Sequence, residues 1–161
     1  MAKSYDACKI LQVMIVLEQK SIHFYETAAE KALNDREKAV YRKLADEERA
    51  HEKVYRHLAA NIPELKSCSI EDDEEPYLEL LIDTNFFIKA AEDDEKMERL
   101  IQSSDVLDLA ERLERDSIHF LVELVRVAPV LKEHESIQKA LSEERRHLRM
   151  ILEKQRLKYI V

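Results

Sequence analysis

The chain has 161 residues, of which 45% are hydrophobic and 37% charged, and its formal net charge is −8. This length fits one domain with a sizeable core. The acidic balance excludes the basic surface that binding to nucleic acid or to an acidic membrane requires. The chain has no glycine and only three prolines. Because sheet proteins use glycine in tight turns and bulges, this composition favours long helices joined by few turns.

The two cysteines, Cys8 and Cys68, stand far apart, and the chain has no Cys-x-x-Cys pair. The sequence therefore lacks the ligands of a zinc ribbon or a rubredoxin-type iron site, and it suggests a reducing compartment. Residues 1–8 lack the layout of a signal peptide. No segment approaches the ~20 apolar residues that span a bilayer. We expect a cytoplasmic protein that does not enter a membrane.

Apolar residues at three- and four-residue steps predict four long helices. The first covers about residues 6–33. The second begins at Asn34-Asp35, where either side chain can cap a helix, and it ends before Pro63. The third covers about residues 105–128, capped by Ser103-Ser104 and broken at Pro129, and the fourth covers about residues 133–159.

A long connection joins the second helix to the third. Residues 61–76 hold two prolines and the acidic run 71–75, which predict a loop, and residues 77–92 predict a short crossover helix. Four long helices with one long crossover match the ferritin-like topology. We therefore predict an all-α fold, a ferritin-like four-helix bundle. Residues 1–161 form a single domain of two pseudo-repeats, about 6–60 and 105–159, joined by the crossover 61–104.

One pattern of acidic residues and histidines occurs twice, at a constant offset of 96 residues (18 to 114 and 48 to 144). Each half holds a single Glu, followed 30 positions later by Glu-x-x-His. Internal repeats of this kind fix the architecture. Carboxylates and imidazoles are also the ligands of dinuclear metal sites in helical bundles. The repeated candidates are Glu18, Glu48, His51, Glu114, Glu144 and His147.

The spacing of these residues predicts that they lie together. The midpoint between Glu18 and Glu48 is residue 33, at the first predicted turn, and the midpoint between Glu114 and Glu144 is Pro129. Residues equidistant from the turn of an antiparallel helix pair lie side by side, here about 22 Å from it. Each histidine follows its glutamate by three residues and shares its face. Glutamate-rich helices can also produce Glu-x-x-His by chance on a solvated face, but two such matches with turns at both midpoints favour a metal site.

Hard carboxylates with imidazoles suit iron or manganese. We predict two iron ions per chain, with manganese as the alternative metal. Without metal, some of the gathered carboxylates should take up protons and have raised pKa values, because the carboxylates repel one another and lose solvation.

Two further residues lie on the predicted ligand face. Glu111 replaces Ile15 of the first half and is a candidate seventh ligand, or an acid that hydrogen-bonds to a ligand. Tyr25 follows Glu18 by seven residues, so its phenol can hydrogen-bond a ligand carboxylate and donate a proton or an electron. The alternative for Tyr25 is packing in the core.

The segments around these ligands resemble the rubrerythrin branch of the ferritin-like superfamily over nearly the whole chain. The resemblance rests on residues 17–25 and 44–51 and on their second-half copies. It implies a di-iron centre that uses hydrogen peroxide or dioxygen. It also implies a role for each ligand. The terminal ligands would be Glu18 and Glu114, and the bridging ligands would be Glu48 and Glu144. The coordination of the two metals would be completed by His51 and His147.

Two departures separate this chain from the family pattern. The rubredoxin-like domain with its Cys-x-x-Cys pairs is missing, so electrons would come from an external donor protein. Ser117 stands where the family carries an extra glutamate that takes part in ligand exchange during peroxide reduction. We predict an oxidoreductase acting on hydrogen peroxide or dioxygen, with a homodimer expected from family habit. The alternatives are a protein that handles or senses iron without turnover and a helical scaffold for partners.

Overall fold

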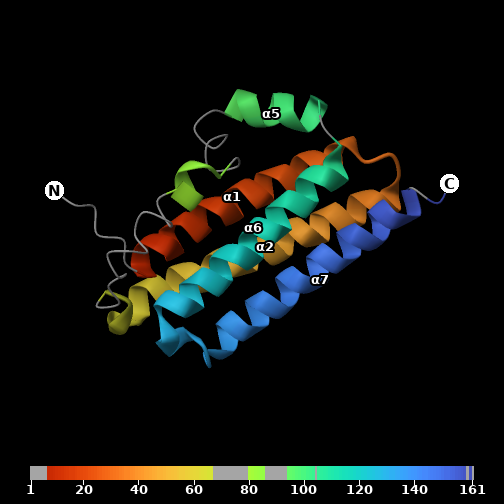
Figure 1. Ribbon diagram of the computed structural model, residues 1–161. Helices are drawn as coiled ribbons and strands as arrows, with labels where there is room; N and C mark the ends of the chain where they lie inside the picture. The colour runs from red at the N-terminus through yellow and green to blue at the C-terminus, as the bar shows by residue number, and fades with distance from the viewer. Residues whose placement is uncertain (1–6, 67–79, 86–93, 104, 159, 161) are drawn as a thin grey trace.

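Four long helices form a bundle in the computed structural model, which describes residues 7–66, 80–85, 94–103, 105–158 and 160 (Figure 1). The helices are α1 (Ala7–Lys31), α2 (Asp35–Asn61), α6 (Val106–Val127) and α7 (Glu135–Lys158). Their arrangement confirms the predicted all-α, ferritin-like four-helix bundle. No helix in the described part of the chain is both long and apolar enough to cross a membrane.

Helix α1 shows how the sequence pattern becomes a buried face. Ile10, Leu11, Met14 and Leu17 are each at most 1% exposed, and their three- and four-residue spacing places them on one side of the helix. The same face continues through Phe24 and faces the other helices. Burial of this apolar stripe is what holds α1 in the bundle.

The predicted cap of α2 is present. Asn34 Oδ1 accepts a hydrogen bond from the backbone N–H of Glu37 at 2.9 Å, and Glu37 Oε2 accepts one from the backbone N–H of Leu33 at 3.1 Å. These two bonds satisfy donors that the first helical turn cannot pair itself. They fix the turn between α1 and α2 at residues 32–34, which contains the predicted midpoint.

The second turn also lies at its predicted midpoint. Helix α6 ends at Val127, a short 3-10 turn covers Pro129–Leu131, and α7 begins at Glu135. Proline cannot donate the backbone hydrogen bond that would continue α6. Each pair of glutamates is therefore separated by a real turn. Glu18 and Glu48 are both 13 residues from the helix ends that flank their turn, whereas Glu114 is 13 residues from the end of α6 and Glu144 is 9 from the start of α7.

The start of the third long helix differs from its prediction. Asp105, not Ser103-Ser104, caps α6, and its Oδ1 accepts from the backbone N–H of Leu107 at 2.9 Å. Ser103 instead ends α5 (Asp94–Ser103), a helix that the sequence did not predict, and Ser104 is outside the described residues. Asp105 also pairs with Lys158, which ties the start of α6 to the end of α7.

Only part of the crossover can be compared with its prediction. Residues 80–83 are helical, within the short helix predicted over 77–92, and most of that helix is outside the described residues. The same holds for the acidic run 71–75. Before it, α2 ends at Asn61, ahead of Pro63 as predicted, and a 3-10 turn at Pro63–Lys66 follows within the predicted loop.

Candidate metal centre

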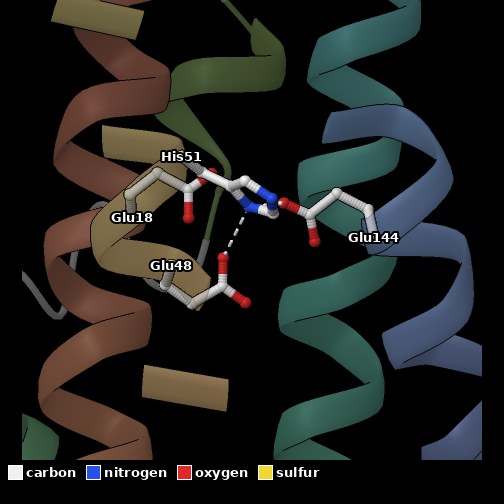
Figure 2. Close-up of side chains that lie close together, drawn as sticks. All are labelled: Glu18, Glu48, His51 and Glu144. Atoms are coloured by element: carbon white, nitrogen blue, oxygen red, sulfur yellow. Dashed lines mark hydrogen bonds and ion pairs between the residues drawn. The ribbon is translucent and has the colours of Figure 1, made fainter. Parts of the chain in front are cut away.

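Polar side chains interrupt the apolar core halfway along the bundle. Six ionisable residues there are at most 2% exposed. They come from all four long helices: Glu18 from α1, Glu48 and His51 from α2, Glu114 from α6, and Glu144 and His147 from α7. Figure 2 shows four of them pointing toward one another. The structure thus brings together the whole set that the repeat predicted.

The six residues divide into two overlapping groups of four. One ligand atom from each member lies within 4.8 Å of the others in its group. The first group contains Glu18 and His51, and we name it the Glu18–His51 position. The second contains Glu114 and His147, the Glu114–His147 position. Glu48 and Glu144 belong to both groups, which is the arrangement that two bridging carboxylates require.

Each histidine turns its Nδ1 atom toward the carboxylates. His51 Nδ1 lies 3.1 Å from Glu48 Oε2 and 2.9 Å from Glu144 Oε1. His147 Nδ1 lies 3.2 Å from Glu48 Oε1 and 3.4 Å from Glu114 Oε2. The two rings stack with their centroids 6.0 Å apart. Both Nδ1 atoms therefore face the space between the four glutamates.

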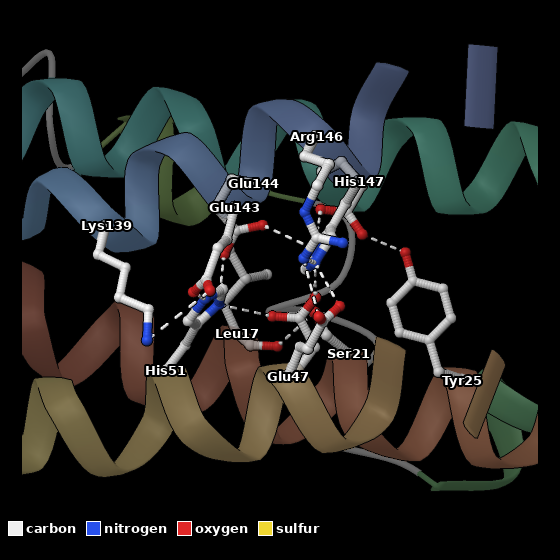
Figure 3. Close-up of polar contacts among 12 residues, drawn as sticks. Leu17, Ser21, Tyr25, Glu47, His51, Lys139, Glu143, Glu144, Arg146 and His147 are labelled. Atoms are coloured by element: carbon white, nitrogen blue, oxygen red, sulfur yellow. Dashed lines mark hydrogen bonds and ion pairs between the residues drawn. The ribbon is translucent and has the colours of Figure 1, made fainter. Parts of the chain in front are cut away.

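The other nitrogen of each ring contacts a carboxylate on the opposite helix (Figure 3). His51 Nε2 lies 3.0 Å from Glu143 Oε2 on α7, and His147 Nε2 lies 2.9 Å from Glu47 Oε2 on α2. A carboxylate in this place accepts a hydrogen bond from Nε2–H and leaves Nδ1 free as an electron-pair donor. Sequence reasoning gave Glu47 and Glu143 no role, although both repeat with the ligands and each directly precedes one.

We call Glu47 and Glu143 the outer glutamates, and their other contacts differ. Glu47 Oε1 accepts from Arg146 Nη2 at 2.8 Å. Burial alone would raise the pKa of Glu47, but Arg146 and His147 outweigh burial and lower it. On the other side, Lys139 Nζ lies 3.9 Å from Glu143 Oε1.

Unpaired atoms in the cluster test whether it fits a metal pair. Neither oxygen of Glu18 has a hydrogen-bond partner among the described residues, although both are buried. His147 Nδ1 lies 3.2 to 3.6 Å from oxygens of three carboxylates, yet no hydrogen bond to any of them has acceptable geometry. Buried polar groups without partners are rare and need an explanation. Cations between these atoms would supply it, so the residues fit the metals that the donor set implies.

The predicted rise in carboxylate pKa holds for two members of the cluster. Burial and the charge of Glu48 raise the pKa values of Glu18 and Glu114 well above the usual range. The pKa of Glu48 shifts in the opposite direction. Burial would raise it, but the close contact and charge of His147 and the hydrogen bond from His51 outweigh burial and lower it to about 2. Burial opposes the charge on His51, yet Glu144 and Glu48 raise its pKa to about 11.

Tyr25 makes the predicted hydrogen bond to a carboxylate of the cluster. Its side chain is fully buried, and its hydroxyl donates to Glu114 Oε1. Burial and the Glu114 carboxylate raise the pKa of Tyr25, so the phenol keeps its proton at neutral pH. Tyr25 also packs in the core, edge-on to Phe24, so the predicted hydrogen bond and the packing are both present, and its role as a proton or electron donor stays a prediction.

Glu111 does not join the cluster. Its carboxylate accepts from Arg115 Nε at 2.8 Å and from Gln155 Nε2 at 2.9 Å, and its side chain is 27% exposed. Glu111 lies one turn from Glu114, but these partners on the outer side of α6 and α7 hold it away from the centre. It is in neither of the two groups of four.

Comparisons with known proteins agree with this geometry. A search of curated proteins finds no match. Among solved structures, a protein from Thermotoga maritima assigned as a ferritin-like diiron-carboxylate protein is similar, with a TM-score of 0.68 and 25% sequence identity. The match covers 97% of this chain and 98% of the other. The model of the rubrerythrin family matches residues 9–154, and this chain therefore belongs to the rubrerythrin family.

Proposed function

We propose that this protein holds two iron ions at the centre of the bundle and reduces hydrogen peroxide or dioxygen there. The observation that carries the proposal is the sharing of Glu48 and Glu144 by the two groups of four. Two separate mononuclear sites would not need shared carboxylates. The same oxygen and nitrogen ligands would also accept manganese.

Each ligand has a distinct role in this proposal. Glu18 and His51 would hold one ion, Glu114 and His147 would hold the other, and Glu48 and Glu144 would contact both. When bound, the iron pair supplies two electrons to the oxidant. Four carboxylates with two neutral imidazoles balance the charge of two divalent cations, which explains how such an acidic cluster can remain buried.

The remaining polar residues would prepare the ligands. Glu47 and Glu143 would accept hydrogen bonds from Nε2–H of the two histidines and thereby orient Nδ1 toward the centre. Tyr25 keeps a proton beside Glu114 and can deliver it to a product formed nearby. The apolar side chains of the bundle exclude bulk water, which strengthens each of these electrostatic contacts.

The electrons would come from an external donor protein, because the chain carries no Cys-x-x-Cys pair for an iron centre of its own. A protein that handles iron without turnover is the second candidate. It is favoured by the position of Glu111, because the two groups of four then contain six different ligands and no further carboxylate for exchange among the residues that the structure describes.

One experiment separates these functions. The protein is loaded anaerobically with ferrous iron and its iron content is measured, and hydrogen peroxide or, in a separate sample, dioxygen is then added with a surrogate reductant. We expect two ions per chain and a rate of peroxide consumption that is proportional to the protein concentration. Two ions without peroxide or dioxygen consumption would support the iron-handling protein. One ion or none would contradict the dinuclear centre.

A further inference from the structure

The two metal positions are related by the internal repeat, but their neighbours differ. At the Glu114–His147 position, Tyr25 donates to Glu114 and Arg146 donates to Glu47, the glutamate that orients His147. The repeat places Leu121 opposite Tyr25 and Ala50 opposite Arg146. Neither of these side chains can donate a hydrogen bond, so the Glu18–His51 position lacks both supports.

The ligands of the Glu18–His51 position are correspondingly less constrained. No donor among the described residues reaches either oxygen of Glu18. Apart from His51, which it orients, Glu143 has among the described residues only the more distant Lys139 contact at 3.9 Å in place of a short arginine pair. Weaker support allows the ligands here to adjust when something else binds.

A buried phenol lies beside this less constrained position. Tyr55 follows His51 by one turn of α2, and the centroids of the two rings are 6.3 Å apart. The side chain is fully buried, and its hydroxyl has no hydrogen-bond partner among the described residues. The repeat places the apolar Ile151 at the matching site of the second half. The unpaired hydroxyl is therefore specific to the Glu18–His51 side.

The hydroxyl of Tyr55 is available as a donor. A tyrosine hydroxyl carries its proton at neutral pH, and this one has no hydrogen-bond partner among the described residues. A buried hydroxyl without a partner destabilises the fold. A small ligand carrying negative charge beside the metal would offer this hydroxyl an acceptor.

We propose that small anions, including the deprotonated form of the oxidant, bind at the Glu18–His51 position and accept a hydrogen bond from Tyr55. The ligand class is a two- or three-atom anion such as hydroperoxide or azide. The Glu114–His147 position, supported by Tyr25 and Arg146, would remain closed to such ligands. This inference rests on the proposed function, because it requires the iron pair.

Azide binding to the oxidised, iron-loaded protein tests the proposal with two matched variants. Tyr55→Phe and Tyr25→Phe each remove one oxygen from a fully buried ring, and the dissociation constant of azide is read from its absorption band. Iron content is measured first. We expect Tyr55→Phe to keep two ions and to weaken azide binding about tenfold, the size of one hydrogen bond to a charged group. Tyr25→Phe leaves Tyr55 in place, so the affinity of the Glu18–His51 position for azide should change by less than about twofold. Azide admitted at the loosened Glu114–His147 position would appear as a separate, second binding step.

The melting temperatures of the metal-free variants give a second readout. Tyr55→Phe should melt at or above the temperature of the unmodified protein, since it removes an unpaired hydroxyl, whereas Tyr25→Phe should melt lower. Unchanged azide affinity in iron-loaded Tyr55→Phe, or an equal loss in Tyr25→Phe, would overturn this inference alone. Failure of the unmodified protein to load two ions would overturn the proposed function together with it.

Discussion

Helices α1 and α2 form one half of the centre, and helices α6 and α7 form the other. Each half supplies a glutamate, a second glutamate and a histidine at the same height in the bundle, from one repeated pattern. The halves diverge within two turns of these ligands, where the first half has two tyrosines and an alanine and the second has apolar residues and an arginine. The matched pairs are Tyr25 and Leu121, Tyr55 and Ile151, and Ala50 and Arg146. A repeat can thus preserve the ligands while their surroundings give the two metal positions different properties.

The largest effect should come from the residues that the halves share. Replacing Glu48 with Ala removes a carboxylate that contacts both positions, so we expect the dinuclear centre to be lost and at most one ion to bind per chain. Glu144→Ala should have the same result. Elemental analysis after anaerobic loading measures it. The control is Glu111→Ala, which should load like the unmodified protein, because Glu111 is hydrogen-bonded outside the cluster. A Glu48→Ala protein with two ions and unchanged absorption on oxidation would show that the bridging role is wrong.

The next largest effect concerns the stability of the metal-free protein, in which side chains of both halves bind more protons than they do in the unfolded chain. The pKa values of Glu18, Glu114, His51 and His147 are all raised. Each such group stabilises the fold fully below its unfolded pKa, and this stabilisation is lost as pH rises toward its folded pKa. The lowered pKa of Glu48, about 2, acts in the opposite direction, but only well below pH 5.

Thermal melts between about pH 5 and pH 8 should therefore show the metal-free protein losing stability as pH rises, by several degrees for each kcal/mol lost. The iron-loaded protein should change little, because its cations have replaced the protons. Parallel profiles for the two forms would indicate that the carboxylates are solvated and that the compact cluster does not exist.

The sequence predicted the position of the cluster because two independent features agreed on it. The 30-residue spacing required turns at residue 33 and Pro129, and the structure has both. The sequence could not show the direction in which each side chain points. Glu111 lies one turn from Glu114, yet Arg115 and Gln155 determine where its carboxylate points.

Other details depended on contacts between helices that spacing cannot reveal. The role of Glu47 follows from His147, which lies on a different helix and 100 residues further along the chain. The low pKa of Glu48 follows from two imidazoles whose orientation those outer glutamates set. The start of α6 was mispredicted because neighbouring residues compete to cap it. Caps can be formed by Ser103, Ser104 or Asp105, and only the structure shows that Asp105 does so.

Substitutions of the outer glutamates, one in each half, should have effects of intermediate size. Glu47→Gln and Glu143→Gln keep the shape of the side chain but weaken the acceptor for the histidine Nε2 proton. Loss of such a partner should lower metal affinity by about 10- to 100-fold. Each variant should affect the position of its own histidine, His147 or His51, so a ferrous titration should show one weakened binding step and one normal step. Equal weakening of both steps in either variant would mean that the two positions are not independent.

The smallest effect should come from Arg146, the residue that most clearly distinguishes the two outer glutamates. Its side chain is 40% exposed and that of Glu47 is 22% exposed, and pairs this accessible contribute only about 0–1 kcal/mol. Arg146→Ala should therefore weaken the Glu114–His147 position by no more than about fivefold, and the difference should shrink as salt screens the pair. Lys139→Ala is the matched control on the other half, and because Lys139 lies 3.9 Å from Glu143 it should change affinity less. If Arg146→Ala made the two binding steps equal at low salt, this single arginine would account for the inequality of the positions. If the steps stayed unequal, the tyrosines of the first half would be its remaining source.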